Sequence, residues 1–279
     1  MDEWDASSSL PGDASLVLQA STKISVESVT SAIVSCLREA ADVGRAGAMT
    51  AYMRGKFEFF GVCAQNRRNC LRDVLKQHGF GCRAFVKKHA LAISRLLYKQ
   101  PQRECHQAAV DVLMKHVGDL GGISALPQLK FLLQENSWWD TVDMLSTNVV
   151  GPIVFGDLEE GRKVMDKWIS HEDMWLRRCA IIHQLKYKGN TDEAVLFRYC
   201  LQRADERKFF IEKAIGWALR QYARENAEAV QQFVATHETR FASLTKREAL
   251  KHVGPYAPLS GTKRKRKTHR RRRIGKKRK

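Results

Sequence analysis

The chain has 279 residues, of which 44% are hydrophobic and 9% aromatic, so it can bury a sizeable core and is not disordered as a whole. Its formal net charge is +18 at pH 7, but residues 263–279 alone contribute 13 Lys or Arg and no acid. No apolar run approaches the roughly 18 residues that a membrane span needs, so we expect a soluble protein with no membrane partner.

The part of the chain between the expected leader and residues 263–279 is itself moderately basic. Residues 26–262 carry 34 Lys or Arg against 26 Asp or Glu. This balance favours a polyanionic partner such as nucleic acid, although basic domains that bind none are common.

Seven cysteines are scattered along the chain at positions 36, 63, 70, 82, 105, 179 and 200. They form no CxxC pair, and none is spaced from a second Cys or His as zinc ligands usually are. We therefore expect buried free thiols in a reducing intracellular compartment, and no metal site.

The elements expected along the chain are helices, because apolar residues recur at steps of three and four. Residues 1–25 have little periodicity and are expected to form a flexible leader, residues 26–256 the folded domain and residues 257–279 a disordered basic tail. The expected helices cover residues 27–44, 46–58, 65–78, 84–98, 102–117, 123–134, 138–151, 158–169, 173–187, 191–203, 207–224, 226–237 and 243–251. Ser137 with Asp140 fits a helix-start signal, and residues 190–193 offer another polar start.

Three large residues recur at an interval of 39: Trp139, Arg178 and Trp217. A period near 40 is typical of HEAT-like helix pairs, which stack into a solenoid. The sequence therefore predicts an all-α, HEAT-like helical-repeat solenoid of antiparallel helix pairs, curved, with these residues along one concave groove.

Trp139 and Asp143 stand four residues apart in NSWWDTVDML, so they share one face of the expected helix and can approach one ligand together. The competing interpretation is a core Trp beside a solvated Asp. In the next candidate helix, WLRRCAIIHQLKYK, adjacent residues point about 100° apart, so Arg177 and Arg178 are expected to have different roles. Arg178 and Lys186 are candidates for binding phosphate, and the alternative is an exposed basic face with nothing bound.

Lys213, Trp217 and Arg220 form a stripe of two cations around an indole. Such a stripe suits a nucleic-acid backbone, with the ring against sugar. A buried Trp between two snorkelling cations is the alternative.

Taken together, these stretches resemble the AlkD-type family of HEAT-like DNA glycosylases, which act in DNA alkylation repair. The resemblance rests on SWWDTVD, WLRRCAIIHQLKYK, FFIEKAIGWALRQYAREN and FVATHETRFASLTKREALKH, together with the opening stretch AYMRGKFEFFGVCAQNRRNCLRDVLKQ. It covers the chain from about residue 45 to residue 252.

The resemblance implies that Asp143 is the catalytic carboxylate and that Trp139 and Trp217 line the cleft beside the deoxyribose of the damaged nucleotide. It implies that Arg178 contacts the DNA backbone or the active site. The further DNA contacts implied are Lys186, Lys213, Arg220, Arg67, Arg68 and Tyr52.

The expected activity is hydrolysis of the N-glycosidic bond of cationic alkylated purines, of the 3-methyladenine or 7-methylguanine type, in double-stranded DNA. Because such a base already carries a positive charge, it leaves without a general acid, and a carboxylate with indole faces can stabilise the oxocarbenium-like sugar. We expect no cofactor, no metal and a monomer. The alternative functions are a non-catalytic DNA-binding solenoid and a HEAT-like protein-interaction scaffold; the first does not need Asp143.

The Lys/Arg clusters of the tail resemble nuclear import signals, which predicts a nuclear protein. The alternative is a tail that only attracts nucleic acid non-specifically.

Overall fold

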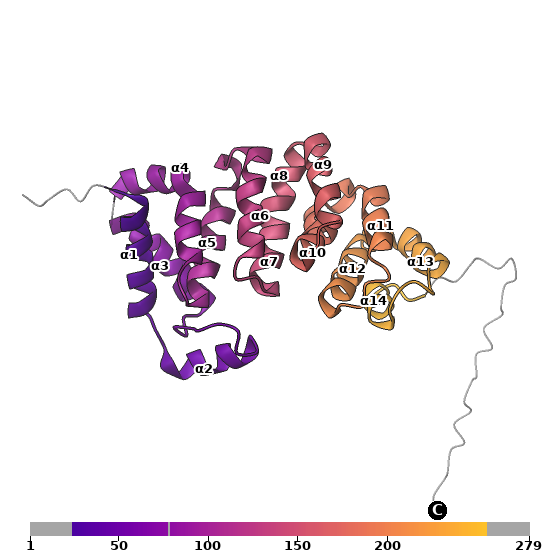
Figure 1. Ribbon diagram of the computed structural model, residues 1–279, viewed down its shortest axis with the longest axis horizontal. Helices are drawn as coiled ribbons and strands as arrows, with labels where there is room; N and C mark the ends of the chain where they lie inside the picture. Colours follow the sequence, from indigo (N-terminus) through magenta and orange to yellow (C-terminus); the bar gives the residue numbers. More distant parts are fainter. Residues whose placement is uncertain (1–23, 78, 256–279) are drawn as a thin grey trace, which may run out of the picture. The chain divides into compact units, whose positions relative to one another are not determined.

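The computed structural model describes residues 24–77 and 79–255, so the basic tail and all but the last two residues of the expected leader lie outside it. Within the described ranges the chain is all-α, with helices packed in adjacent pairs, as the sequence predicts (Figure 1). No helix of these ranges is both long enough and apolar enough to cross a membrane.

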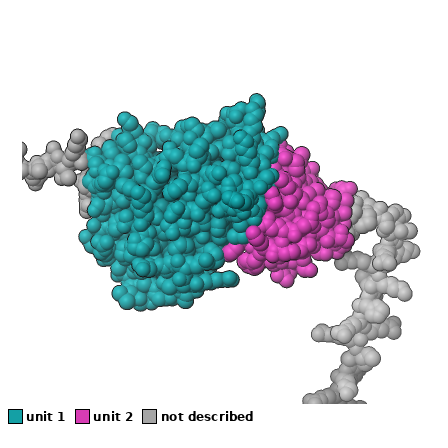
Figure 2. Space-filling model, viewed as in Figure 1, with its two compact units in different colours: residues 1–179 teal, residues 180–279 magenta. Residues whose placement is uncertain are grey.

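The α-helices are α1 (Val26–Glu39), α2 (Val43–Tyr52), α3 (Ala64–Gln77), α4 (Gly79–Tyr98), α5 (Arg103–Lys115), α6 (Leu126–Gln134), α7 (Trp139–Leu145), α8 (Gly151–Gly156), α9 (Leu158–Ile169), α10 (Met174–Ile182), α11 (Glu193–Gln202), α12 (Phe209–Tyr222), α13 (Ala227–Thr236) and α14 (Ser243–Ala249). The chain forms two compact units, residues 1–179 and residues 180–279, which Figure 2 colours teal and magenta. Unit 1 holds α1 to α9 and most of α10, and unit 2 holds α11 to α14.

The core of unit 1 is built from helix faces with apolar residues at steps of three and four. On α1, Val29, Ile33 and Leu37 are buried, and the helix packs against α3 and α4. A capping box between Ser25 and Ser28 begins this helix. In turn α4 packs against α5 and α5 against α7, which ties the start of the chain to the helix that carries Trp139.

The expected helices over 27–44 and 46–58 are wrong in their boundaries. A break follows Glu39, and Asp42 caps α2 by accepting a hydrogen bond from the backbone N–H of Arg45. The α2 helix ends at Tyr52, because Arg54 and Gly55 both adopt positive φ. The break creates a short separate helix whose residues are all at least partly exposed.

The region expected to be one helix over 138–151 is a longer, interrupted one. It begins as α7, passes through a π-helical turn over residues 146–150 and continues as α8. The helix-start role of Ser137 is wrong: Trp138 is the N-cap residue, and the Ser137 hydroxyl donates to the carbonyl of Leu133. Asp140 is bound elsewhere, by a buried arginine described below.

Unit 2 is held by α12, which packs against α11, α13 and α14. The polar start at residues 190–193 is confirmed, since Asp192 caps α11 by accepting from the backbone N–H of Val195. Phe197 of α11 stacks on Phe233 of α13 with ring centroids 4.0 Å apart. Five cysteines are buried free thiols, as expected, whereas Cys36 and Cys63 are half-buried.

Candidate active site

Trp139 and Asp143 lie on one face of α7, as their spacing predicts, and both are half-buried. The π-helical turn follows directly, and the hydroxyl of Thr147 donates to the carbonyl of Asp143 across it. Single π-turns inside helices are frequent at functional sites, because they alter which side chains face a cleft.

Asp143 is bound by the arginine that the sequence placed one repeat later. The Arg178 Nε lies 2.7 Å from Asp143 Oδ1, and Nη2 lies 2.8 Å from Oδ2. The two side chains are 5% and 14% exposed. Burial raises the pKa of Asp143 above its ordinary value, and the hydrogen bonds and charge of Arg178 oppose this rise. The guanidinium of Arg178 therefore binds both oxygens of the Asp143 carboxylate.

Tyr52 and Trp139 form an aromatic wall in unit 1, and Trp139 lies four residues before Asp143 on α7. The ring of Tyr52, at the end of α2, meets Trp139 edge to face with centroids 5.9 Å apart and an interplanar angle of 79°. Tyr52 is 70% exposed. Both rings line a cavity of about 560 Å³, to which Met49 and Met144 also contribute. Most of the residues that line the cavity are apolar, and Asp143 and Arg178 are not among them.

A buried arginine fixes the first turn of α7. Arg103 is completely buried and binds both carboxylate oxygens of Asp140, at 2.6 and 3.2 Å. It also donates to the hydroxyl of Thr141 and to the carbonyl of Asn136, and its guanidinium lies 3.9 Å from the ring centroid of Phe57. The pair therefore holds the helix that carries Trp139 and Asp143.

The segment between α2 and α3 is anchored by a second buried group, Glu104. Its carboxylate accepts three backbone hydrogen bonds, from the N–H groups of Phe60, Gly61 and Val62. Gly61 has a φ of 87°, and a Cβ there would clash with the backbone oxygen of Asp42, so only glycine fits. This anchor fixes the segment that follows Tyr52.

The two arginines of α3 have different environments. Arg67 is buried and donates to Asp111 at 2.8 Å and to Gln107 at 2.7 Å, so its guanidinium supports the floor of the cavity. The side chain of Arg68 is 56% exposed and lies 3.8 Å from Asp111. Of these two arginines, which were predicted as phosphate contacts, Arg68 is the more exposed.

In unit 2, α12 presents Lys213, Trp217 and Arg220 at the predicted spacing, and all three are half-buried. Lys213 Nζ lies 2.6 Å from Glu248 of α14, and Arg220 binds the other oxygen of the same carboxylate. The hydrogen bond from Lys213 is the main reason that the pKa of Glu248 is lowered, with burial opposing and Arg220 adding to the effect. Lys186 is exposed at the end of the 3₁₀ turn after α10.

Unit 1 thus carries a sequestered carboxylate, its arginine partner and an aromatic wall. Unit 2 by itself carries a cation–indole stripe. Among the residues that the structure describes, no cluster of three or more His, Cys, Asp or Glu side chains could hold a metal ion.

Comparison with known proteins places this arrangement in a family. A protein-family model described as "DNA alkylation repair enzyme" matches residues 33–253, which is most of the chain. The protein belongs to the DNA alkylation repair enzyme family. Among solved structures, one described as a predicted DNA alkylation repair enzyme from Enterococcus faecalis superposes with a TM-score of 0.69 at 27% identity, over 76% of this chain and 96% of that one. No match was found among curated proteins.

Membership of the DNA alkylation repair enzyme family agrees with the resemblance drawn from the sequence. The matched range contains every residue singled out as a site residue, and it ends before the basic tail. The sequence did not point to Arg103, Glu104 or Glu248. Nothing in their local pattern separates them from ordinary helix residues, because their partners lie between 28 and 44 positions away.

Proposed function

We propose that this member of the DNA alkylation repair enzyme family is a DNA glycosylase that hydrolyses the N-glycosidic bond of cationic alkylated purines in double-stranded DNA. The observation that carries the proposal is the Asp143 carboxylate, 14% exposed and bound by Arg178, on the same helix face as Trp139.

The ion pair with Arg178 favours the ionised form of Asp143, although the carboxylate is largely buried. A bidentate guanidinium uses one lone pair on each carboxylate oxygen and leaves the others free to accept from a water molecule. Arg178 also offsets the desolvation that would otherwise favour the neutral acid. The carboxylate can therefore remain anionic in a site that excludes much of the solvent.

In the proposed reaction, the bond between C1′ and the purine nitrogen breaks first, and the bonding electrons leave with the base. Because the base starts cationic, it departs neutral and needs no proton. The negative charge of Asp143 and the face of Trp139 stabilise the sugar as it becomes positive. A water molecule that donates a hydrogen bond to Asp143 then adds to C1′ and transfers its proton to that carboxylate, which leaves an abasic site. Trp217 is proposed to act beside the same sugar, with Lys186, Lys213, Arg220 and Arg68 binding phosphates.

The decisive experiment measures release of 7-methylguanine from alkylated duplex DNA by the wild-type protein and by Asp143→Asn. Loss of most of the release with unchanged DNA affinity is expected, because Asn keeps the shape but not the charge. Glu159→Gln, an exposed acid on α9, is the matched control and should retain activity. Binding of duplex DNA without any base release by the wild type would favour the non-catalytic DNA-binding alternative.

The tail, which lies outside the described residues, supports a second proposal about location. Its 13 Lys or Arg within residues 263–279 are proposed to act as a nuclear import signal. A monomer is the proposed state.

A further inference from the structure

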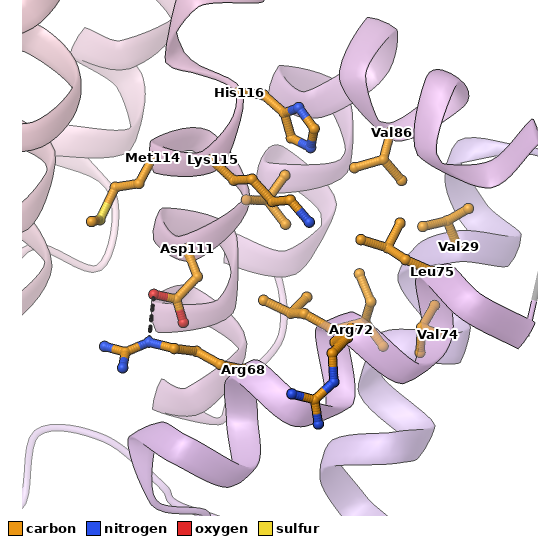
Figure 3. Close-up of a pocket in the computed structure, with 13 residues that line it drawn as sticks. Val29, Arg68, Arg72, Val74, Leu75, Val86, Asp111, Met114, Lys115 and His116 are labelled. Carbon is orange, nitrogen blue, oxygen red and sulfur yellow. Dashed lines mark ion pairs between the residues drawn. The ribbon is translucent and has the colours of Figure 1, made fainter. Parts of the chain in front are cut away.

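A second cavity of unit 1, away from Trp139 and Asp143 in its lining, has no role in the proposed reaction. It measures about 410 Å³ and is bounded by α1, α3, α4 and α5 (Figure 3). Its apolar walls include Val29 and Ile33 of α1, Val74 of α3 and Val86 of α4, all almost completely buried. An apolar group that entered this space would gain hydrophobic burial against these walls.

The rim of this cavity is cationic. Its cations are Arg68 and Arg72 of α3 and Lys115 at the end of α5 (Figure 3). His116 also lines the rim, but burial lowers its pKa, so it adds no charge at neutral pH. The arginine side chains are 56% and 54% exposed. Asp111 is the one acid among the described lining residues, and its main partner is Arg67 at 2.8 Å, with Arg68 at 3.8 Å. Arg72 lies 3.6 Å from Asp73, outside the lining. The cavity therefore suits an occupant with an apolar centre and negative flanks.

The chain itself carries such a group. Its first five residues read MDEWD, a Trp flanked by three acids, and the first 23 residues contain four acids against one Lys. This segment joins the described chain at Ile24, just before α1, which contributes two walls of the cavity.

The length of the segment allows it to return to the cavity. The 19 residues between Trp4 and Ile24 can span up to about 60 Å when extended, far more than the one or two helical turns that separate Val26 from Val29 and Ile33. A tether of this kind also raises the effective concentration of its end to the millimolar range, so that even a weak site is filled.

We propose that the N-terminal segment docks on this cavity of its own chain, with the indole of Trp4 between the apolar walls and the acids Asp2, Glu3 and Asp5 at the Arg68, Arg72 and Lys115 rim. Docking of this kind covers Arg68 with carboxylates. Because Arg68 is a proposed phosphate contact, the segment then opposes DNA binding; this consequence, unlike the docking, rests on the proposed function.

The test uses the full chain labelled with 5-fluorotryptophan and ¹⁹F NMR, and it needs neither DNA nor activity. The Trp4→Phe variant identifies the Trp4 resonance by its disappearance. In the wild type this resonance should be shifted and broadened relative to a labelled peptide of residues 1–23. In the double variant Arg72→Glu with Lys115→Glu it should return to the peptide position. Arg247→Glu with Lys251→Glu makes the same charge change on exposed residues of unit 2 and should leave the resonance where it is.

A wild-type Trp4 resonance that coincides with the free peptide would overturn the proposal. So would an equal displacement by both double variants, which indicates general attraction to a basic protein, or a shift that depends on protein concentration, which indicates docking on a second copy. If the rim variant does not fold, salt supplies the same test. Raising the ionic strength from about 0.05 M to about 1 M should move the wild-type resonance to the peptide position, because it screens the rim.

Discussion

Asp143 and Arg178 form a two-point ion pair between α7 and α10, with nitrogen–oxygen distances of 2.7 and 2.8 Å and little exposure of either side chain. Burial and Arg178 act on the pKa of Asp143 in opposite directions, and burial is the larger effect. The arginine therefore acts on the proposed chemistry through the protonation state of the carboxylate.

Removing that arginine should move the acidic side of the pH–rate profile. Excision requires ionised Asp143, so activity is lost as the pH falls through its raised pKa. In Arg178→Met the opposing effect is gone, the pKa rises further, and the acidic side should move to higher pH. Base release measured from pH 5 to pH 9 under single-turnover conditions checks this.

Arg178→Lys is the control for that shift, because it keeps the charge but loses the two-point geometry. Its profile should lie between those of the wild type and Arg178→Met. An unchanged acidic side in both variants would contradict a role of Arg178 in setting the pKa of Asp143.

Arg103 should be needed for stability rather than for contact with DNA. Replacing it by Met leaves Asp140 buried without its partner, a change that typically costs about 3–5 kcal/mol. Urea unfolding should show this loss, and the double variant with Asp140→Asn should be less destabilised than the two single effects added together. Lys163→Met removes two exposed ion pairs on α9, with Glu159 and Glu160, and should change stability by less than about 1 kcal/mol. Equal effects of the two substitutions would refute the role of Arg103.

Sequence patterns identified what lies within one helix. The four-residue spacing placed Trp139 and Asp143 on one face, and the three- and four-residue steps placed Lys213, Trp217 and Arg220 on another. They also identified the all-α class, because helical periodicity is a local property.

What the sequence missed depends on partners that are distant in the chain. Arg178 was expected to contact the DNA backbone or the active site, and the sequence did not predict its pairing with Asp143, which joins residues 35 positions apart. The Ser137 helix start was wrong because Asp140, the acid of that motif, is bound by Arg103 from 37 positions away. A local motif shows which side chains could cap a helix, whereas tertiary packing decides which partner each side chain binds.

Glu248 should restrain the affinity of the α12 stripe for DNA, because it binds both Lys213 and Arg220. In Glu248→Gln the two cations become available to phosphates. Affinity for unmodified duplex at low salt should rise severalfold, and the dependence of log K on log salt should steepen by about one to two phosphate contacts. Fluorescence anisotropy of a labelled duplex over a salt series measures both.

Glu228→Gln is the matched control for Glu248, since it removes one exposed acid of the neighbouring helix α13 without freeing a cation pair. Its effect should be confined to the small gain expected from one unit of net charge. If both variants changed the salt dependence equally, Lys213 and Arg220 would not be the phosphate contacts that Glu248 restrains.

Deleting residues 261–279 should separate location from chemistry. The family match ends at residue 253, so the helical domain should remain folded and excision at saturating enzyme should persist. Non-specific affinity should fall and its salt dependence should flatten, because fewer phosphate-bound cations release fewer counterions.

A fluorescently labelled full-length protein should concentrate in the nucleus, whereas the truncated protein should spread through the cell. A version in which the 13 cations are kept but their order is shuffled distinguishes a signal from bulk charge: it should still bind DNA non-specifically, and loss of nuclear concentration would show that clustering matters. Identical distributions of the full-length and truncated proteins would remove the import proposal and leave the assignment of Asp143 untouched.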